Sequence, residues 1–143
     1  MNRIVVEATK RSFAKETLRV RSIARITLRL LKKDGYTLNL FLLSLPEIQK
    51  INYQWRKKNT PTNVISFAEC DSEEQFPKQS FNKNHLGEIY MSTEFIRVHQ
   101  QSIDHMVVHG ILHLLGYDHI KKIDAEKMER REQWLLSRIT KKS

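Results

Sequence analysis

The chain of 143 residues lacks the features that mark several large classes of protein. Its one cysteine, Cys70, excludes an intramolecular disulfide and a multi-cysteine zinc cluster within one copy of the chain. This cysteine usage fits a reducing compartment, and we expect a cytoplasmic protein. No apolar run approaches the roughly 18 residues of a membrane span, so no contact with the bilayer interior is expected. The opening residues show neither an apolar signal core nor a cleavage site, so we expect no secretory signal.

The chain also lacks internal repeats and any linker that would separate two folded units. Hydrophobic residues make up 40% of the chain and charged residues 29%, which excludes a disordered, low-complexity protein. A chain of this length can bury its own core. We therefore expect one domain over residues 1–143.

Positive charge is concentrated at one end of the sequence. The formal net charge is +9, and residues 1–33 hold ten Lys and Arg against two Asp and Glu, so the rest of the chain is nearly neutral. Such a localised field suggests a surface that meets a polyanion, such as nucleic acid or the anionic face of a membrane. The alternative is a basic protein whose charge only keeps it in solution.

The hydrophobic pattern predicts an α+β domain with a small mixed four-stranded sheet and about five helices, because strands and helices do not alternate strictly. Strands are expected over residues 4–6, 36–43, 64–67 and 86–91. Helices are expected over residues 12–33, 44–55, 102–115 and 122–138, with a short one capped by Ser92 or Thr93. Residues 56–62 form a basic loop, and residues 69–84 read as an exposed one.

The first and last of these helices are amphipathic. Residues expected on the inward face of the first are Phe13, Leu18, Ile23, Ile26, Leu30 and Leu31. Those of the last are Ile123, Met128, Trp134, Leu135 and Ile139. On the first helix Arg21, Arg25 and Arg29 follow one another at intervals of four and form a positive stripe. The stripe is either the solvated face of the helix or a contact for phosphates.

The most informative segment is HGILHLLGYDH, residues 109–119. His109 and His113 lie one helical turn apart on a helix that is apolar nearly all round, and such a helix is buried. Buried imidazoles need partners, and this spacing lets two of them reach one metal ion. Gly116 allows the chain to turn back after the helix, so His119 can supply a third ligand. His105 lies too far from His113 to share that ion.

Three histidines without a clear fourth ligand are typical of a catalytic zinc site, where the open position holds a water that ionises near neutral pH. Asp118 is a candidate fourth ligand, a candidate partner for a histidine, or a turn residue. We therefore predict one Zn²⁺ per chain, although three imidazoles also suit nickel, copper or iron. Gly110 stands where zinc proteases carry a glutamate base, which disfavours peptidase chemistry, and we expect the glycine to open space beside the ion.

Residues 109–119 resemble the signature of the YbeY family of bacterial endoribonucleases. Two further blocks are similar to that family: NYQWR followed by PTNVISF (residues 52–56 and 61–67), and LGEI (residues 86–89). The chain departs from the family pattern at Trp55, where tyrosine is usual, and at Ala68, where proline is usual. Residues 69–84 match poorly.

The resemblance implies a zinc-dependent endoribonuclease specific for single-stranded RNA. It implies a role in ribosomal RNA processing, including the 3′ end of the small-subunit RNA, and in ribosome quality control. It further implies His109, His113 and His119 as metal ligands and Arg56 as the basic residue on which activity depends. A guanidinium there can hold a phosphate and neutralise charge that develops at phosphorus.

We expect the substrate to be held by Arg56, Lys57 and Lys58 together with the stripe of Arg21, Arg25 and Arg29. The nucleophile is either a metal-activated water or the 2′-hydroxyl of the RNA, and the sequence does not decide between them. Nor does it fix the oligomeric state. Two other functions stay open: a ribosome-assembly factor that binds RNA around a structural metal, and a metalloprotease-like hydrolase. The latter needs a carboxylate over the metal, for which Glu88 and Asp118 are candidates.

Overall fold

A computed structural model describes residues 1–69, 84–117 and 120–142 of the chain. The predicted α+β domain is confirmed, and its described residues form four strands and five helices whose ends differ from the expected ones by a few residues. In chain order the elements are β1 (Arg3–Ala8), the 3₁₀ turn η1 (Arg11–Phe13), α1 (Ala14–Leu30), β2 (Thr37–Leu42), α2 (Leu45–Arg56), β3 (Val64–Ala68), β4 (His85–Met91), α3 (Thr93–Val98), α4 (Ile103–Leu114) and α5 (Lys122–Lys142).

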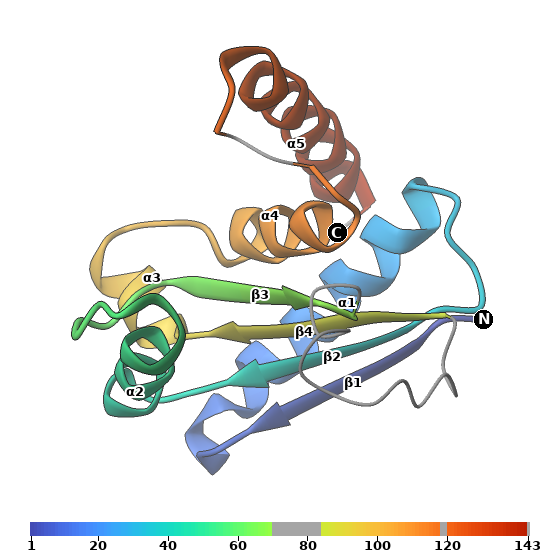
Figure 1. The fold of residues 1–143 in the computed structure, drawn as a ribbon. Coiled ribbons are helices and arrows are strands. Elements are labelled where there is room, and N and C mark those ends of the chain that lie inside the picture. Colours follow the sequence, from blue (N-terminus) through green and yellow to red (C-terminus); the bar gives the residue numbers. More distant parts are fainter. Residues whose placement is uncertain (70–83, 118–119, 143) are drawn as a thin grey trace.

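The four strands form one mixed sheet in the order β1-β2-β4-β3 (Figure 1). Strands β1, β2 and β4 run parallel, and β3 pairs antiparallel with β4 at the edge of the sheet. Parallel neighbours need a crossover between them, and α1 supplies it between β1 and β2. Helices α1 and α4 pack on one face of the sheet, and α5 packs across both of them.

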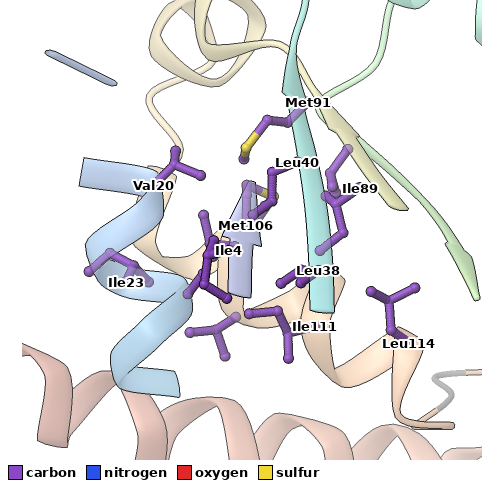
Figure 2. Packing of buried hydrophobic residues seen from close by; sticks show 14 of the residues in the cluster. Ile4, Val20, Ile23, Leu38, Leu40, Ile89, Met91, Met106, Ile111 and Leu114 are labelled. Carbon is purple, nitrogen blue, oxygen red and sulfur yellow. The ribbon is translucent and has the colours of Figure 1, made fainter. Parts of the chain in front are cut away.

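The main core lies between the sheet and the helices α1 and α4. Alternate residues of β2, namely Leu38, Leu40 and Leu42, are fully buried on this face, as the two-residue period of a strand requires. Figure 2 shows strand residues meeting Val20 of α1 and Ile111 of α4. The other face carries a smaller cluster in which Ile48 of α2 packs with Ile65 of β3.

Three residues expected on inward helix faces are exposed instead, and those predictions are wrong. Leu18 of α1 is 66% exposed, because the buried face of that helix is set by residues three and four apart: Val20, Ile23, Ala24, Thr27 and Leu28. In α5 the predicted burial of Met128, Leu135 and Ile139 is confirmed, but Ile123 and Trp134 face outward. The Trp134 ring instead lies beside the guanidinium groups of Arg131 and Arg138.

None of the helices in the described part of the chain is both long and apolar enough to cross a membrane.

Candidate metal centre and cleft

Helix α4 carries three histidines along one edge, and the sequence explains where it begins and ends. The Ser102 side chain caps the first turn by accepting a hydrogen bond from the backbone N–H of His105. After the last turn Gly116 adopts a φ of +97°, which confirms the predicted turn. Between these ends His105, His109 and His113 follow one another at intervals of one turn, with ring centroids 6.3 and 4.5 Å apart.

His109 and His113 point the same ring nitrogen at each other. Their Nε2 atoms lie 3.1 Å apart. Two nitrogen ligands of a tetrahedral zinc ion, with Zn–N bonds of about 2.0–2.1 Å, are separated by about 3.3 Å. The observed spacing therefore fits two imidazoles that share one ion, and their role as ligands stays a prediction.

Glu132 of α5 meets these histidines from the other side. Its Oε2 atom lies 2.7 Å from Nε2 of His105 and 3.0 Å from Nδ1 of His109. The residue is only 8% exposed. Burial alone would raise the pKa of Glu132, but its hydrogen bonds with His109 and then His105 outweigh burial, so the pKa lies below its ordinary value. The carboxylate is therefore ionised at neutral pH.

His105, His109 and Glu132 also form a group that could itself hold a metal ion, because their ligand atoms all lie within 4.8 Å of one another. Two possible positions for an ion therefore lie on opposite sides of the His109 ring. One lies between the Nε2 atoms of His109 and His113, and the other lies at Glu132. The predicted third ligand, His119, and the candidate Asp118 lie outside the described residues.

The expectation that Gly110 opens space beside the ion is wrong. Gly110 is buried against the sheet, and a Cβ atom there would lie 3.0 Å from Cδ1 of Ile89 and 3.2 Å from Oγ of Ser66. The space that a side chain would need here is therefore already filled by Ile89 of β4 and Ser66 of β3. The missing side chain of Gly110 lets α4 approach the sheet closely, which brings His109 and His113 to the edge strand β3.

A cleft of about 400 Å³ opens beside the two histidines. It runs between α4, the edge strand β3 and the end of α2, and its lining residues are Arg56, Lys58, Asn63, Val64, Ser66, Ala68, His109, His113 and Leu114. Partial burial lowers the pKa of Arg56, and its guanidinium remains a cation at any physiological pH. The cleft thus combines two imidazoles that could bind a metal ion with cations that can bind phosphate.

The basic segment after α2 is held in place by side chains of that helix. The Asn52 amide, which is buried, donates to the carbonyl oxygen of Thr60 at 2.9 Å. The Gln49 amide donates to the side-chain and backbone oxygens of Asn59 at 3.0 and 3.2 Å. These contacts fix the turn that brings Lys58 beside Arg56 at the mouth of the cleft.

The structure does not bring every predicted residue to this cleft. Lys57, which ends α2 with a φ of +61°, is not among the lining residues. Arg25 and Arg29 line a separate groove of about 470 Å³ together with Met1, Asn2, Lys32, Lys33 and Asp34. Arg21 lines neither of these two depressions. Their predicted contacts with substrate therefore stay predictions.

Glu88 is not placed as a base over the histidines. It interacts with Tyr90, which packs in the cluster on the opposite face of the sheet, where burial and then the Glu88 charge raise the pKa of Tyr90 to about 12. The described carboxylate nearest His109 is Glu132, and it meets Nδ1 rather than Nε2. A glutamate base poised beside the Nε2 atoms, which a metalloprotease would need, is therefore not found in the described ranges.

Sequence reasoning missed Glu132. The signal was present, because Met128, Glu132, Leu135 and Ile139 are spaced three and four apart and so share one face of α5. A carboxylate on an otherwise apolar inward face requires a partner in the core. The histidines of α4 are that partner.

Comparison with known proteins identifies the type of domain. The family model described as Endoribonuclease YbeY matches residues 4–140. A protein of that name from Francisella philomiragia is 40% identical, over 71% of this chain and 68% of the relative. Another, from Aquifex aeolicus, is 31% identical over 98% of this chain and 93% of the relative.

Among solved structures, a Thermotoga maritima protein determined in solution is similar with a TM-score of 0.55. The match covers 97% of this chain and 93% of that protein, at 24% sequence identity. At this level of identity the likeness bears on the fold alone.

Proposed function

This chain belongs to the endoribonuclease YbeY family, and from that membership we propose that residues 1–143 form a single zinc-dependent endoribonuclease domain. Its substrate would be single-stranded ribosomal RNA, and its roles the maturation of the 3′ end of the small-subunit RNA and ribosome quality control. Its partners would be the ribosome or its small subunit, in the cytoplasm. The observation that carries the proposal is the pair of Nε2 atoms, 3.1 Å apart, in the wall of a cleft that also holds Arg56.

In this proposal His109, His113 and His119 hold one Zn²⁺. Imidazole nitrogens are ligands that zinc prefers, and the convergence of the first two rings supports a shared ion. A zinc ion bound there would activate a water molecule or the RNA 2′-hydroxyl as the nucleophile.

Arg56 would bind the scissile phosphate. Its guanidinium lines the cleft together with His109 and His113, and its donors match two phosphate oxygens at once. As charge builds on the phosphate during cleavage, a cation already in place stabilises it without reorganisation. Lys58, on the same side of the cleft, would neutralise a neighbouring phosphate.

The remaining predicted contacts lie further from the reaction. Lys57 follows Arg56 at the rim, and Arg21, Arg25 and Arg29 lie on α1. We propose that these cations bind phosphates of the RNA beyond the cleft. Such contacts would add affinity that depends on salt but not on RNA sequence.

The decisive experiment measures metal content and RNA cleavage in the same preparations. We expect the protein to retain about one zinc per chain and to cut a single-stranded RNA. A chelator should abolish cleavage, and added Zn²⁺ should restore it. His113→Ala should lose both the metal and cleavage while it retains much of its RNA binding, because that binding comes from the basic surfaces.

Arg56→Ala gives the matched contrast. It should keep the metal but cut RNA about 10²–10³-fold more slowly, the usual loss when one group that stabilises transition-state charge is removed. Lys50→Ala, which removes an exposed cation of α2 away from the cleft, should cut normally. If metal-free protein or His113→Ala cleaved RNA at the normal rate, the proposed function would be wrong, and an RNA-binding assembly factor would replace it.

A further inference from the structure

A single buried carboxylate oxygen accepts hydrogen bonds from two histidines of the neighbouring helix. Oε2 of Glu132 receives Nε2 of His105 at 2.7 Å and Nδ1 of His109 at 3.0 Å. A buried charge costs free energy unless it is paired, so this arrangement is more than a surface contact. The proposed metal ligands His109, His113 and His119 do not by themselves account for this contact of Glu132.

We infer that Glu132 is a positioning residue that sets the orientation and the tautomer of His109 for metal binding. The inference rests on the proposed metal site and goes beyond it, because it assigns a role to a residue that is not among the proposed ligands. Glu132 acts through His109 and does not itself bind the ion.

The position of the hydrogen on His109 follows from its contact with Glu132. Oε2 of Glu132 lies within hydrogen-bond distance of Nδ1 of His109 and Nε2 of His105, and a carboxylate oxygen accepts hydrogen bonds, so Nδ1 of His109 carries the hydrogen. In a neutral imidazole the other nitrogen, Nε2, then presents its lone pair. That Nε2 atom lies 3.1 Å from Nε2 of His113, where the two ligands would share an ion. Glu132 therefore selects the tautomer that zinc requires.

His105 explains why the carboxylate stays in place. Its Nε2–H donates to the same oxygen from one turn earlier on α4, so Oε2 is held from two sides. With both hydrogen bonds on that oxygen, Glu132 is already satisfied without an ion. A metal ion bound at this oxygen would have to replace both of these contacts, whereas an ion between the Nε2 atoms of His109 and His113 would replace the contact between those two nitrogens.

Carboxylates that hydrogen-bond to a ligating histidine in this way raise the basicity of the ligand and fix its ring, and their loss lowers metal affinity by about 10–100-fold. The test is Glu132→Gln, which keeps the shape of the side chain but removes its charge. Glu129→Gln, an exposed position of the same helix, is the control for charge and helix composition.

The affinity of metal-depleted protein for Zn²⁺ is measured by competition with a chromophoric chelator. We expect Glu132→Gln to bind Zn²⁺ about 10–100-fold more weakly and Glu129→Gln to bind it normally. Nitrogen-15 NMR of the unsubstituted, metal-free protein should find His109 protonated at Nδ1. This second measurement needs no variant, so it stands even if Glu132→Gln fails to fold.

Two results would overturn the inference. If Glu132→Gln bound Zn²⁺ as tightly as the unsubstituted protein, or if His109 were protonated at Nε2, Glu132 would only join α5 to α4. If instead Glu132→Gln lost Zn²⁺ binding altogether while His113→Ala retained it, Glu132 would be a ligand with His105 and His109. The proposed function fails separately, when metal-free protein or His113→Ala cuts RNA normally.

Discussion

Gly87 of β4 has a φ of +141°, a backbone conformation that other residues rarely adopt. A Cβ atom at this position would overlap the carbonyl oxygen of Phe67 and lie 3.0 Å from Cδ2 of Leu114. Leu114 follows His113 directly and lines the cleft. The missing side chain therefore lets the end of α4 lie close against the sheet, where the cleft forms.

We predict that Gly87→Ala lowers the free energy of unfolding by about 2–4 kcal/mol, because it adds backbone strain to overpacking against backbone atoms that cannot move aside. Urea unfolding measures the change. Gly35→Ala is the control, since Gly35 also has a positive φ, +79°, but its Cβ would meet no atom within 4 Å. An equal loss at both positions would show that packing at Gly87 contributes nothing beyond strain.

Helix α2 connects local sequence to the cleft, because it begins at a capping box and ends at Arg56. The backbone N–H of Ser44 donates to Oε1 of Glu47 at 3.0 Å, and the Ser44 hydroxyl donates to the same oxygen at 2.6 Å. The Thr9 hydroxyl adds a third hydrogen bond at 2.8 Å. The hydrogen bonds from Ser44 hold the pKa of Glu47 below its ordinary value.

This lowered pKa predicts how the stability of the domain depends on pH. The ionised form of Glu47 is favoured in the folded state, so its contribution is fully present above the unfolded pKa of about 4.3 and is lost as the pH falls through the folded value. At pH 7 we expect Glu47→Gln to lower the free energy of unfolding by about 0.5–1 kcal/mol. Glu126→Gln, at an exposed position of α5, should have little effect.

Urea unfolding of both proteins from pH 7 down to pH values below the folded pKa would follow this contribution. The difference between the unsubstituted protein and Glu47→Gln should shrink as the solution becomes acidic. A difference that stayed constant, or grew, with falling pH would mean that the charge of Glu47 does not stabilise the cap.

Local patterns predicted most of these elements and failed where the answer depended on packing between them. The start of α2 at Ser44, the cap of α3 at Ser92 or Thr93 and the turn at Gly116 were predicted because each depends on neighbours in sequence. The role of Gly110 was not, because it depends on how close α4 lies to Ile89 of β4. Local spacing brings histidines to one helix face, but it does not say which helix crosses above them.

In the candidate site, too, some features follow from local sequence and others from packing between elements. The pairing of His109 with His113 followed from their spacing, whereas Glu132 lies 23 residues after His109, on another helix, and meets it only in the folded core. The grouping of Arg56 and Lys58 with the histidines depends on the edge position of β3, which no local pattern fixes.

Positive side chains line two separate depressions in the described part of the chain. One is the cleft with Arg56 and Lys58, and the other is the groove lined by Arg25 and Arg29 near the N-terminus. Helix α5 packs against both α1 and α4, so the two surfaces belong to one body of packed helices. A single-stranded RNA that extends beyond the cleft would gain affinity from the second surface without any change in the chemistry at the first.

This arrangement predicts that the groove lined by Arg25 and Arg29 affects the binding of RNA and not the rate of its cleavage. Arg25→Ala combined with Arg29→Ala should weaken the binding of single-stranded RNA, while the cleavage rate at saturating RNA stays unchanged. Each phosphate contact to a single strand contributes about 0.7 to the slope of log affinity against log salt concentration. The double variant should therefore lower that slope by about 1.4.

Lys127→Ala with Arg130→Ala, two exposed cations of α5, removes the same charge elsewhere and should leave the slope nearly unchanged. Equal slopes for the Arg25/Arg29 variant and the unsubstituted protein would mean that the stripe is only the solvated face of α1, because a contact with phosphate must release counterions.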